Sequence, residues 1–274
     1  MSEDTGREHV SKKAVVYRIA GMDAAAVRRD VEYTAAGAGA LTMDIYYPPD
    51  FKSGARTPAV VIVAGFPDAG FKAKVGCKFK EMGSSVSWGR LLAASGLVAI
   101  TYTNREPEAD VHALLEYVRG NAAALGIDEN RGGLWASSGN VALALSVLMR
   151  EGGDYLKCAA LCYGYTLDLD GSTGVAEAAG AWGFVNPCAG KTVADLPPRT
   201  PLFIARAGRD EMPRLNETLD RFLLRALTRN LPLTLVNHPD APHAFDLFND
   251  SETSHEIVRR ILEFMRFHLL TVGK

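Results

Sequence analysis

A serine pair, an aspartate and a histidine come after three separate apolar runs of the chain, in that order. Ser137 and Ser138 come after the run 132–136, Asp210 comes after the run 201–205, and His243 comes after the run 233–236. A serine hydroxyl, a histidine base and an acid that orients the histidine are the groups that covalent acyl transfer needs. Each signal alone is ambiguous, because serine and aspartate also cap helices. Together they predict serine-hydrolase chemistry, provided that the three runs end at one place.

The serine pair lies in the segment WASSGN, residues 135–140, between an apolar run and an apolar helical pattern. A serine on a tight turn between a strand and a helix exposes its hydroxyl above the helix N-terminus. The backbone N–H of Ser138 then becomes a candidate oxyanion donor. A second donor is expected from the loop that begins at Gly65 and Phe66, directly after the run 59–64.

Six apolar runs are predicted to be the strands that position these residues. They occupy residues 59–64, 97–101, 132–136, 158–162, 201–205 and 233–236. Between them, apolar residues recur with helical spacing, for example over 111–118, 215–226 and 257–265. Strands that alternate with helices predict an α/β fold, with a mostly parallel central sheet and helices on both faces. Ligands bind beyond the carboxyl ends of such strands, where the serine, aspartate and histidine follow.

The beginning and the middle of the chain depart from this alternation. The segments 14–20, 28–34 and 41–47 are β-prone and are expected to form an antiparallel N-terminal edge. No linker divides the chain, so residues 1–274 are interpreted as one domain. The segment 164–200 is long for a connection, and is predicted to be a cap-like insertion. Trp135, and Trp182 and Phe184 within that insertion, are candidates for the substrate pocket.

The composition narrows the class of protein. The 274 residues are 47% hydrophobic and 23% charged, with a formal net charge of −2, which excludes disorder and gives no electrostatic reason to expect nucleic acid. The four cysteines form no CxxC pair, and no metal site is predicted. No secretory signal or apolar run long enough for a membrane span is visible. We therefore expect a cytoplasmic globular protein that does not bind membranes, with a homo-oligomer as one possible assembly.

With these motifs the sequence resembles the α/β-hydrolase superfamily over about residues 40–270, and in particular its dienelactone-hydrolase and small-esterase branch. The resemblance covers a nucleophile elbow of the G-x-S-x-G type at Ser137 and Gly139, an acid loop at Gly208, Asp210 and Pro213, and the sequence His-Ala-Phe at 243–245. It implies an α/β-hydrolase fold with Ser137 as nucleophile, Asp210 as acid and His243 as base. Gly65 or Phe66, with Ser138, would form the oxyanion hole.

The chain departs from the family pattern at three positions. Trp135 replaces the first elbow glycine, Asn140 replaces a glycine that often follows the motif, and Ala64 stands where many relatives have histidine. Moving the elbow by one residue to Ser138 would put Ala136 and Asn140 at the glycine positions, which favours Ser137. The elbow also lacks the cysteine of true dienelactone hydrolases.

The expected activity is hydrolysis of a small-molecule carboxylic ester through an acyl-enzyme, with no cofactor. A lactone or thioester hydrolase would use the same residues, and a non-catalytic binding protein of the same fold is the alternative from another class. Lys72, Lys74, Lys78 and Lys80 lie near the expected oxyanion loop. They are interpreted either as a solvated loop or as a docking site for an anionic substrate.

Overall fold

The computed structural model describes residues 9–34, 39–52, 54–153 and 155–271. Eight strands form one sheet in the order β1-β2-β4-β3-β5-β6-β7-β8. The strands are β1 (Ala26–Glu32), β2 (Thr42–Tyr47), β3 (Thr57–Ile62), β4 (Val98–Tyr102), β5 (Ile127–Ser137), β6 (Leu156–Cys162), β7 (Leu202–Ala207) and β8 (Leu233–His238). In the order of the sheet, every neighbouring pair from β4 through β3, β5, β6 and β7 to β8 is parallel. Strand β2 is antiparallel to both β1 and β4.

The predicted parallel sheet with an antiparallel edge is therefore confirmed, and each of the six apolar runs lies in or overlaps a parallel strand. The expectation of a strand over 14–20 is wrong. This segment instead contacts two helices: the Val15 N–H donates to Ser87 Oγ (2.9 Å) and the Val16 N–H donates to the Asp246 carbonyl (2.8 Å). Its backbone groups thus find partners outside the sheet.

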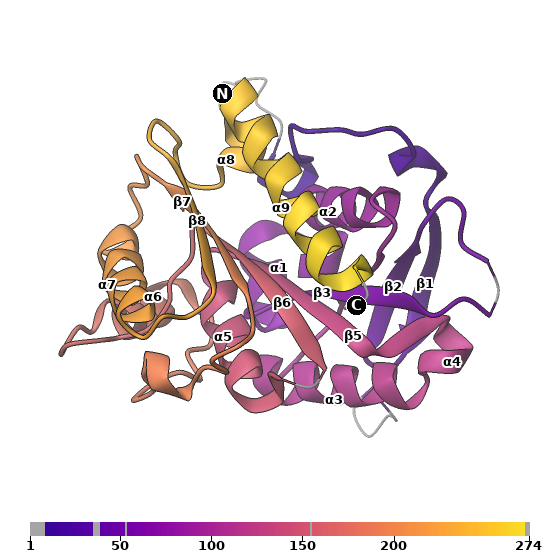
Figure 1. Ribbon diagram of the computed structural model, residues 1–274, viewed down its shortest axis with the longest axis horizontal. Coiled ribbons are helices and arrows are strands. Elements are labelled where there is room, and N and C mark those ends of the chain that lie inside the picture. The colour runs from indigo at the N-terminus through magenta and orange to yellow at the C-terminus, as the bar shows by residue number, and fades with distance from the viewer. Residues whose placement is uncertain (1–8, 35–38, 53, 154, 272–274) are drawn as a thin grey trace.

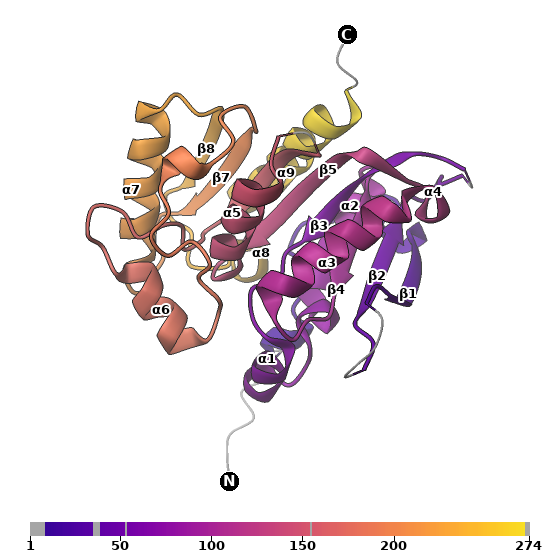
Figure 2. The same ribbon diagram turned by 90° about the horizontal axis from the view of Figure 1, so that it is seen from below.

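Helices cover both faces of the sheet, as Figures 1 and 2 show. Helices α2 and α9 lie on one face, and α3 and α5 lie on the other. The helices are α1 (Asp68–Val75), α2 (Gly83–Ala94), α3 (Pro107–Gly120), α4 (Ala122–Leu125), α5 (Asn140–Glu151), α6 (Gly174–Trp182), α7 (Leu215–Thr228), α8 (Phe245–Phe248) and α9 (Glu252–Leu270), with 3₁₀ turns η1 (Val10–Lys12), η2 (Met22–Ala24), η3 (Phe79–Glu81) and η4 (Val193–Asp195). Within the described residues, none of the helices has the length and apolar character needed to cross a bilayer.

The segment 164–200 contains α6 and η4 and joins β6 to β7. The Val185 N–H donates to the Gly65 carbonyl (2.9 Å), so the segment contacts the loop that follows β3. This contact brings the segment to the carboxyl end of the parallel strands. Whether it acts as a cap remains a prediction.

A buried ion pair ties the antiparallel edge to η3. Lys80 is 5% exposed, and its Nζ lies 2.7 Å from Asp44 Oδ1 in β2 and 2.6 Å from Asp30 Oδ1 in β1. Burial alone would lower the pKa of Lys80, but the hydrogen bonds to both carboxylates outweigh it and raise the pKa. Lys80 is therefore a structural cation and cannot serve as a docking site for a substrate.

Replacing Lys80 with methionine is expected to lower the free energy of unfolding by about 3 kcal/mol, because the buried Asp44 carboxylate loses its nearest cation and keeps only Arg29, 3.6 Å away. Urea denaturation followed by circular dichroism measures the loss. The matched control is Lys72→Met on the exposed face of α1, which should change the stability by less than about 0.5 kcal/mol. Equal effects of the two changes would show that the Lys80 pair does not stabilise this edge.

Candidate active site

The turn between β5 and α5 places two serines in different surroundings. Ser137 is the last residue of β5, whereas Ser138 follows it on the turn with a φ of 54°, in the left-handed region. The Ser138 N–H donates to the Cys162 carbonyl of β6 (3.0 Å), which fixes the turn against the neighbouring strand. A non-glycine residue in this conformation is strained, and such strain is characteristic of functional turns.

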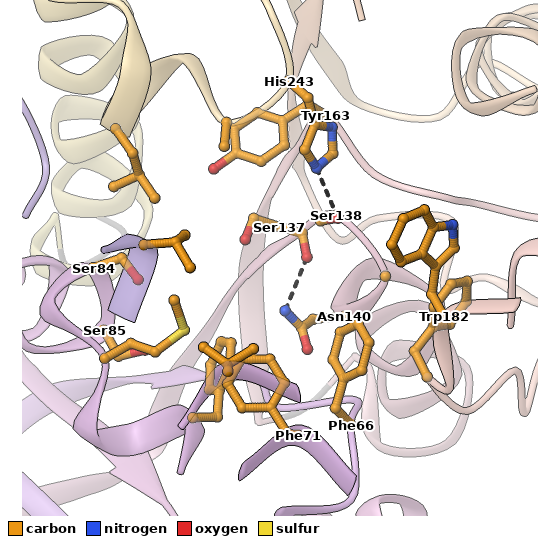
Figure 3. A pocket seen from close by; sticks show the side chains of 18 of the residues that line it. Phe66, Phe71, Ser84, Ser85, Ser137, Ser138, Asn140, Tyr163, Trp182 and His243 are labelled. Atoms are coloured by element: carbon orange, nitrogen blue, oxygen red, sulfur yellow. Dashed lines mark hydrogen bonds between the residues drawn. The ribbon is translucent and has the colours of Figure 1, made fainter. Parts of the chain in front are cut away.

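Ser138 belongs to a continuous hydrogen-bonded chain with His243 and Asp210. Its Oγ lies 2.9 Å from His243 Nε2 (Figure 3), and His243 Nδ1 lies 2.7 Å from Asp210 Oδ2. The structure thus brings together the predicted aspartate and histidine, but with Ser138. The sequence interpretation, which placed Ser137 next to the histidine, is corrected by one residue.

The steric arrangement around the turn explains this correction. With Ser138 as the elbow serine, the second glycine position of the motif is occupied by Asn140, and Gly139 lies directly after the serine. The loop after β3 approaches Asn140 closely, because Gly65 has no side chain. A Cβ added to Gly65 would lie 3.1 Å from the Asn140 Cα. On the other side of Ser138, the small residue is the fully buried Ala136. A glycine requirement read from the elbow alone therefore gave the wrong register.

Asp210 is held on the loop after β7 and its side chain has no exposed surface. Its Oδ1 accepts the Met212 N–H (2.9 Å), which leaves Oδ2 for the imidazole. Because an ionised carboxylate only accepts hydrogen bonds, the shared proton belongs to His243 Nδ1. The Nε2 atom is then an acceptor for the Ser138 hydroxyl, as a general base requires.

Tyr163 and Asp246 support the histidine, and the sequence analysis missed both. The Tyr163 ring packs edge-on against the His243 imidazole, with centroids 5.1 Å apart. Its hydroxyl donates to Asp246 Oδ1 (2.6 Å), and Trp88 Nε1 donates to Asp246 Oδ2 (2.8 Å). Burial raises the pKa of Asp246, although both hydrogen bonds oppose this. These residues come from distant elements, so no local pattern marked them.

The predicted oxyanion donors are also revised. The Gly65 N–H donates to Asn140 Oδ1 (2.7 Å), and the Ser138 N–H is used by Cys162, so neither is available for a substrate. Among the described residues, the N–H groups of Phe66 and Gly139 have no protein acceptor. Of the three predicted donors, only Phe66 remains, and Gly139 joins it.

Asn140 connects the turn to the loop after β3. It is buried, its Oδ1 accepts from Gly65, and its Nδ2 donates to the Ser137 carbonyl (3.0 Å). A glycine at this position would make neither contact. Asparagine at this position therefore adds two hydrogen bonds, which we call the Asn140 brace, between the turn at Ser138 and the loop after β3.

Ser138 and His243 line a cavity of about 470 Å³ whose walls are mainly apolar. The candidate pocket residues Trp135, Trp182 and Phe184 all line it. Trp135 is 3% exposed and packs against Trp88 with centroids 4.6 Å apart, so the bulky residue before the turn is accommodated in the core. A Cβ on Gly139 would lie 2.5 Å from Phe184, which shows how closely that ring approaches the turn.

The remaining lysines of the basic run do not form a cluster at the cavity. Lys72 and Lys74 are exposed on α1, and Lys74 lines the cavity while its Nζ donates to the Trp182 carbonyl (2.7 Å). Lys78 lies half-buried before η3. In the part of the chain that the structure describes, no group of three or more His, Cys, Asp or Glu residues is placed to hold a metal ion.

Comparison with known proteins identifies the fold. No family model matches the chain, and no curated protein matches it either. Among solved structures, the esterase Est2 of Thermogutta terrifontis is similar at 20% identity and a TM-score of 0.66, over 92% of this chain and 96% of that chain.

Two other similar structures share this architecture. LAE6, an alpha/beta hydrolase from the metagenome of Lake Arreo, Spain, was solved as a serine-to-alanine variant, and matches at 21% identity and a TM-score of 0.67, over 92% of this chain and 87% of that chain. A bacterial heroin esterase matches at 17% identity and a TM-score of 0.69, over 90% and 86%. The predicted α/β-hydrolase fold is confirmed, whereas the resemblance to dienelactone hydrolases remains a prediction.

Proposed function

We propose that the protein is a serine-dependent hydrolase of small carboxylic esters, which acts through an acyl-enzyme. The hydrogen-bonded chain from Ser138 through His243 to Asp210, at the wall of an apolar cavity, carries this proposal. Ser138 Oγ attacks the ester carbonyl while His243 Nε2 takes its proton and later returns it to the leaving alcohol. His243 then activates a water molecule that releases the acid and regenerates the serine.

The free N–H groups of Phe66 and Gly139 are the proposed oxyanion donors. They flank Ser138 from two segments, and Gly139 directly follows it, the usual source of one donor in this fold. Preorganised donors of this kind stabilise the charge that develops on the carbonyl oxygen. The brace through Asn140 keeps these segments at a fixed separation.

The choice of an ester agrees with the cavity and with the similar structures. Est2 was solved with bound propionate and butyrate, and also phosphoramylated by tabun and phosphonylated by sarin. By analogy we infer short acyl chains and reactivity with organophosphorus reagents for this chain. Lactones and thioesters would pass through the same steps. The departures from the family pattern at Trp135 and Asn140 are accommodated without displacing Ser138 from His243.

Labelling with a fluorophosphonate probe, followed by peptide mass mapping, tests the proposal without a guess at the substrate. We expect the label on Ser138, its loss in Ser138→Ala, and its retention in Ser137→Ala. A panel of ester, lactone and thioester substrates would then define the class. Absence of label on protein that is folded by circular dichroism would overturn the proposed function.

Replacing Asn140 with alanine is expected to lower kcat by about tenfold to 100-fold, because the loop that carries the Phe66 donor loses its brace. KM should change by less than about threefold, since the cavity walls remain. Steady-state kinetics on a butyrate ester measures both. Asn121→Ala, at the exposed end of α3, is the control and should leave both constants unchanged. A rise in KM with kcat preserved would contradict a role of Asn140 in positioning the donor.

A further inference from the structure

The cavity beside Ser138 has two chemically different ends. On one side of Ser138 lie the rings of Phe66, Tyr165, Trp182 and Phe184, which we call the aromatic end. On its other side lie the side chains of Ser84, Ser85, Ser137 and Tyr163, which we call the hydroxyl end. Figure 3 shows Ser84 and Ser85 opposite Phe66 and Trp182, with the Tyr163 hydroxyl turned toward the Ser84 side. An ester has an acyl side and an alcohol side, and the two ends of the cavity offer them different surroundings.

The hydroxyl end has unused hydrogen-bonding capacity. Ser85 is 2% exposed, and its Oγ has no partner among the described residues. The Ser84 carbonyl accepts the Ser87 hydroxyl, and no hydrogen bond of the Ser84 side chain is found in the described part of the chain. Both residues lie in the first turn of α2, whose N-cap provides no side-chain bond. Tyr163 donates its proton to Asp246, and its oxygen also interacts with the Ser137 side chain, so Ser84 and Ser85 provide the unused capacity of this end. Buried hydroxyl groups are normally paired, so an unpaired one on a cavity wall is available to a hydrogen-bonding group of a ligand.

Among the described residues that line the cavity, the hydroxyl end has no lysine or arginine to bind an anionic group. Asp246, which lies beneath Tyr163, adds no positive charge there. The lysine that lines the cavity, Lys74, is held by the Trp182 carbonyl at the aromatic end. A group that both donates and accepts hydrogen bonds without charge, such as an alcohol, fits the hydroxyls of Ser84 and Ser85.

We infer that the hydroxyl end binds a free hydroxyl group of the substrate, so that the preferred substrates are esters that carry an alcohol on one side of the scissile bond. The two sources are a monoester of a polyol and an ester of a hydroxy acid. The inference rests on the proposed function, because it assigns the two ends to the two sides of a reacting ester. It adds a recognition site that the serine, histidine and aspartate do not provide.

Matched substrate pairs test the inference. Glycerol monobutyrate against propyl butyrate places the hydroxyl on the alcohol side, and ethyl 3-hydroxybutyrate against ethyl butyrate places it on the acyl side. We expect kcat/KM to favour the hydroxylated ester by about tenfold or more in one pair, since each neutral hydrogen bond gives a severalfold preference. In the Ser84→Ala/Ser85→Ala variant this ratio should fall toward one. Ser95→Ala, at the other end of α2, should keep the wild-type ratio.

Ratios near one in both pairs, or a preference that survives the double alanine variant, would overturn the inference. Because Ser85 has no protein partner, Ser85→Ala should melt no lower than the wild-type protein, so a loss of preference is not a loss of folding. Calorimetric titration of Ser138→Ala with glycerol monobutyrate and propyl butyrate provides a readout without turnover. If no ester is hydrolysed and no fluorophosphonate label appears, the proposed function fails. If esters are hydrolysed but glycerol monobutyrate binds no more tightly than propyl butyrate and neither substrate pair shows a preference, only this inference fails.

Discussion

Replacing Ser138 with alanine is expected to lower kcat/KM for a short-chain ester by about 10⁴-fold, because no other hydroxyl is bonded to His243 Nε2 in the described part of the chain. Ser137→Ala should lower it by less than about tenfold. Ser137 belongs to β5, and its backbone carbonyl, which the substitution retains, makes the contact with Asn140. The two substitutions are chemically identical and one residue apart, so each is the control for the other.

The measurement needs protein free of host esterases, since a contamination of one part in 10⁴ would equal the expected residual rate. Comparison of the residual activity with the fraction of fluorophosphonate-reactive protein settles this point. A large loss in Ser137→Ala with activity preserved in Ser138→Ala would return the nucleophile to the residue favoured by the sequence. Similar large losses in both would indicate that the turn itself had been disturbed.

The change Asp210→Asn is expected to lower kcat by about 10³-fold to 10⁴-fold. Oδ1 of Asp210 accepts the Met212 N–H, so the asparagine amide oxygen is fixed there and its NH₂ group faces His243 Nδ1. The imidazole then must carry its proton on Nε2, where it would donate to Ser138 and could not accept the serine proton. The substitution thus preserves the packing and reverses the tautomer.

Asp246→Asn is the matched control, because it makes the same change at a second buried carboxylate near His243. Asp246 accepts from Tyr163 and Trp88 but makes no hydrogen bond to the imidazole. We expect less than about a tenfold loss of kcat, with a fall in melting temperature, since an asparagine cannot accept both bonds with the same two oxygens. Stopped-assay kinetics and thermal denaturation on the same samples separate the effects. An equal loss of kcat in both variants would contradict the tautomer argument.

The positions of Asp210 and His243 were accessible from the sequence because each follows its own apolar run. The runs ending near Ala205 and Val236 became β7 and β8, whose carboxyl ends meet at one edge of the sheet. The exact turn residue was not accessible. Choosing between Ser137 and Ser138 depended on which backbone segment faces Asn140, and that segment is Gly65, more than 70 residues away.

Other errors have the same cause, which is that long-range partners override local pattern. The segment around Val15 and Val16 has strand-like composition, but Ser87 and Asp246 satisfy its N–H groups. Lys80 belongs to a basic run for which a solvated loop was one interpretation, but its side chain is buried in an ion pair with Asp44 of β2. The oxyanion donors were misassigned because the acceptors for Gly65 and Ser138 lie on other elements. In contrast, the helical spacing over 257–265 depends only on local periodicity, and it identified α9 correctly.

Helix α9 packs on β5, β6, β7 and β8 through Ile257, Ile261 and Met265, which are almost fully buried. A growing chain emerges from the ribosome with its N-terminus first, so the central strands are synthesised long before the helix that covers them. During that interval the strands expose the apolar surface that α9 covers in the folded protein, which favours association of unfinished chains. Chains cut before Glu252 retain every proposed catalytic residue, yet we expect them to accumulate as insoluble aggregates.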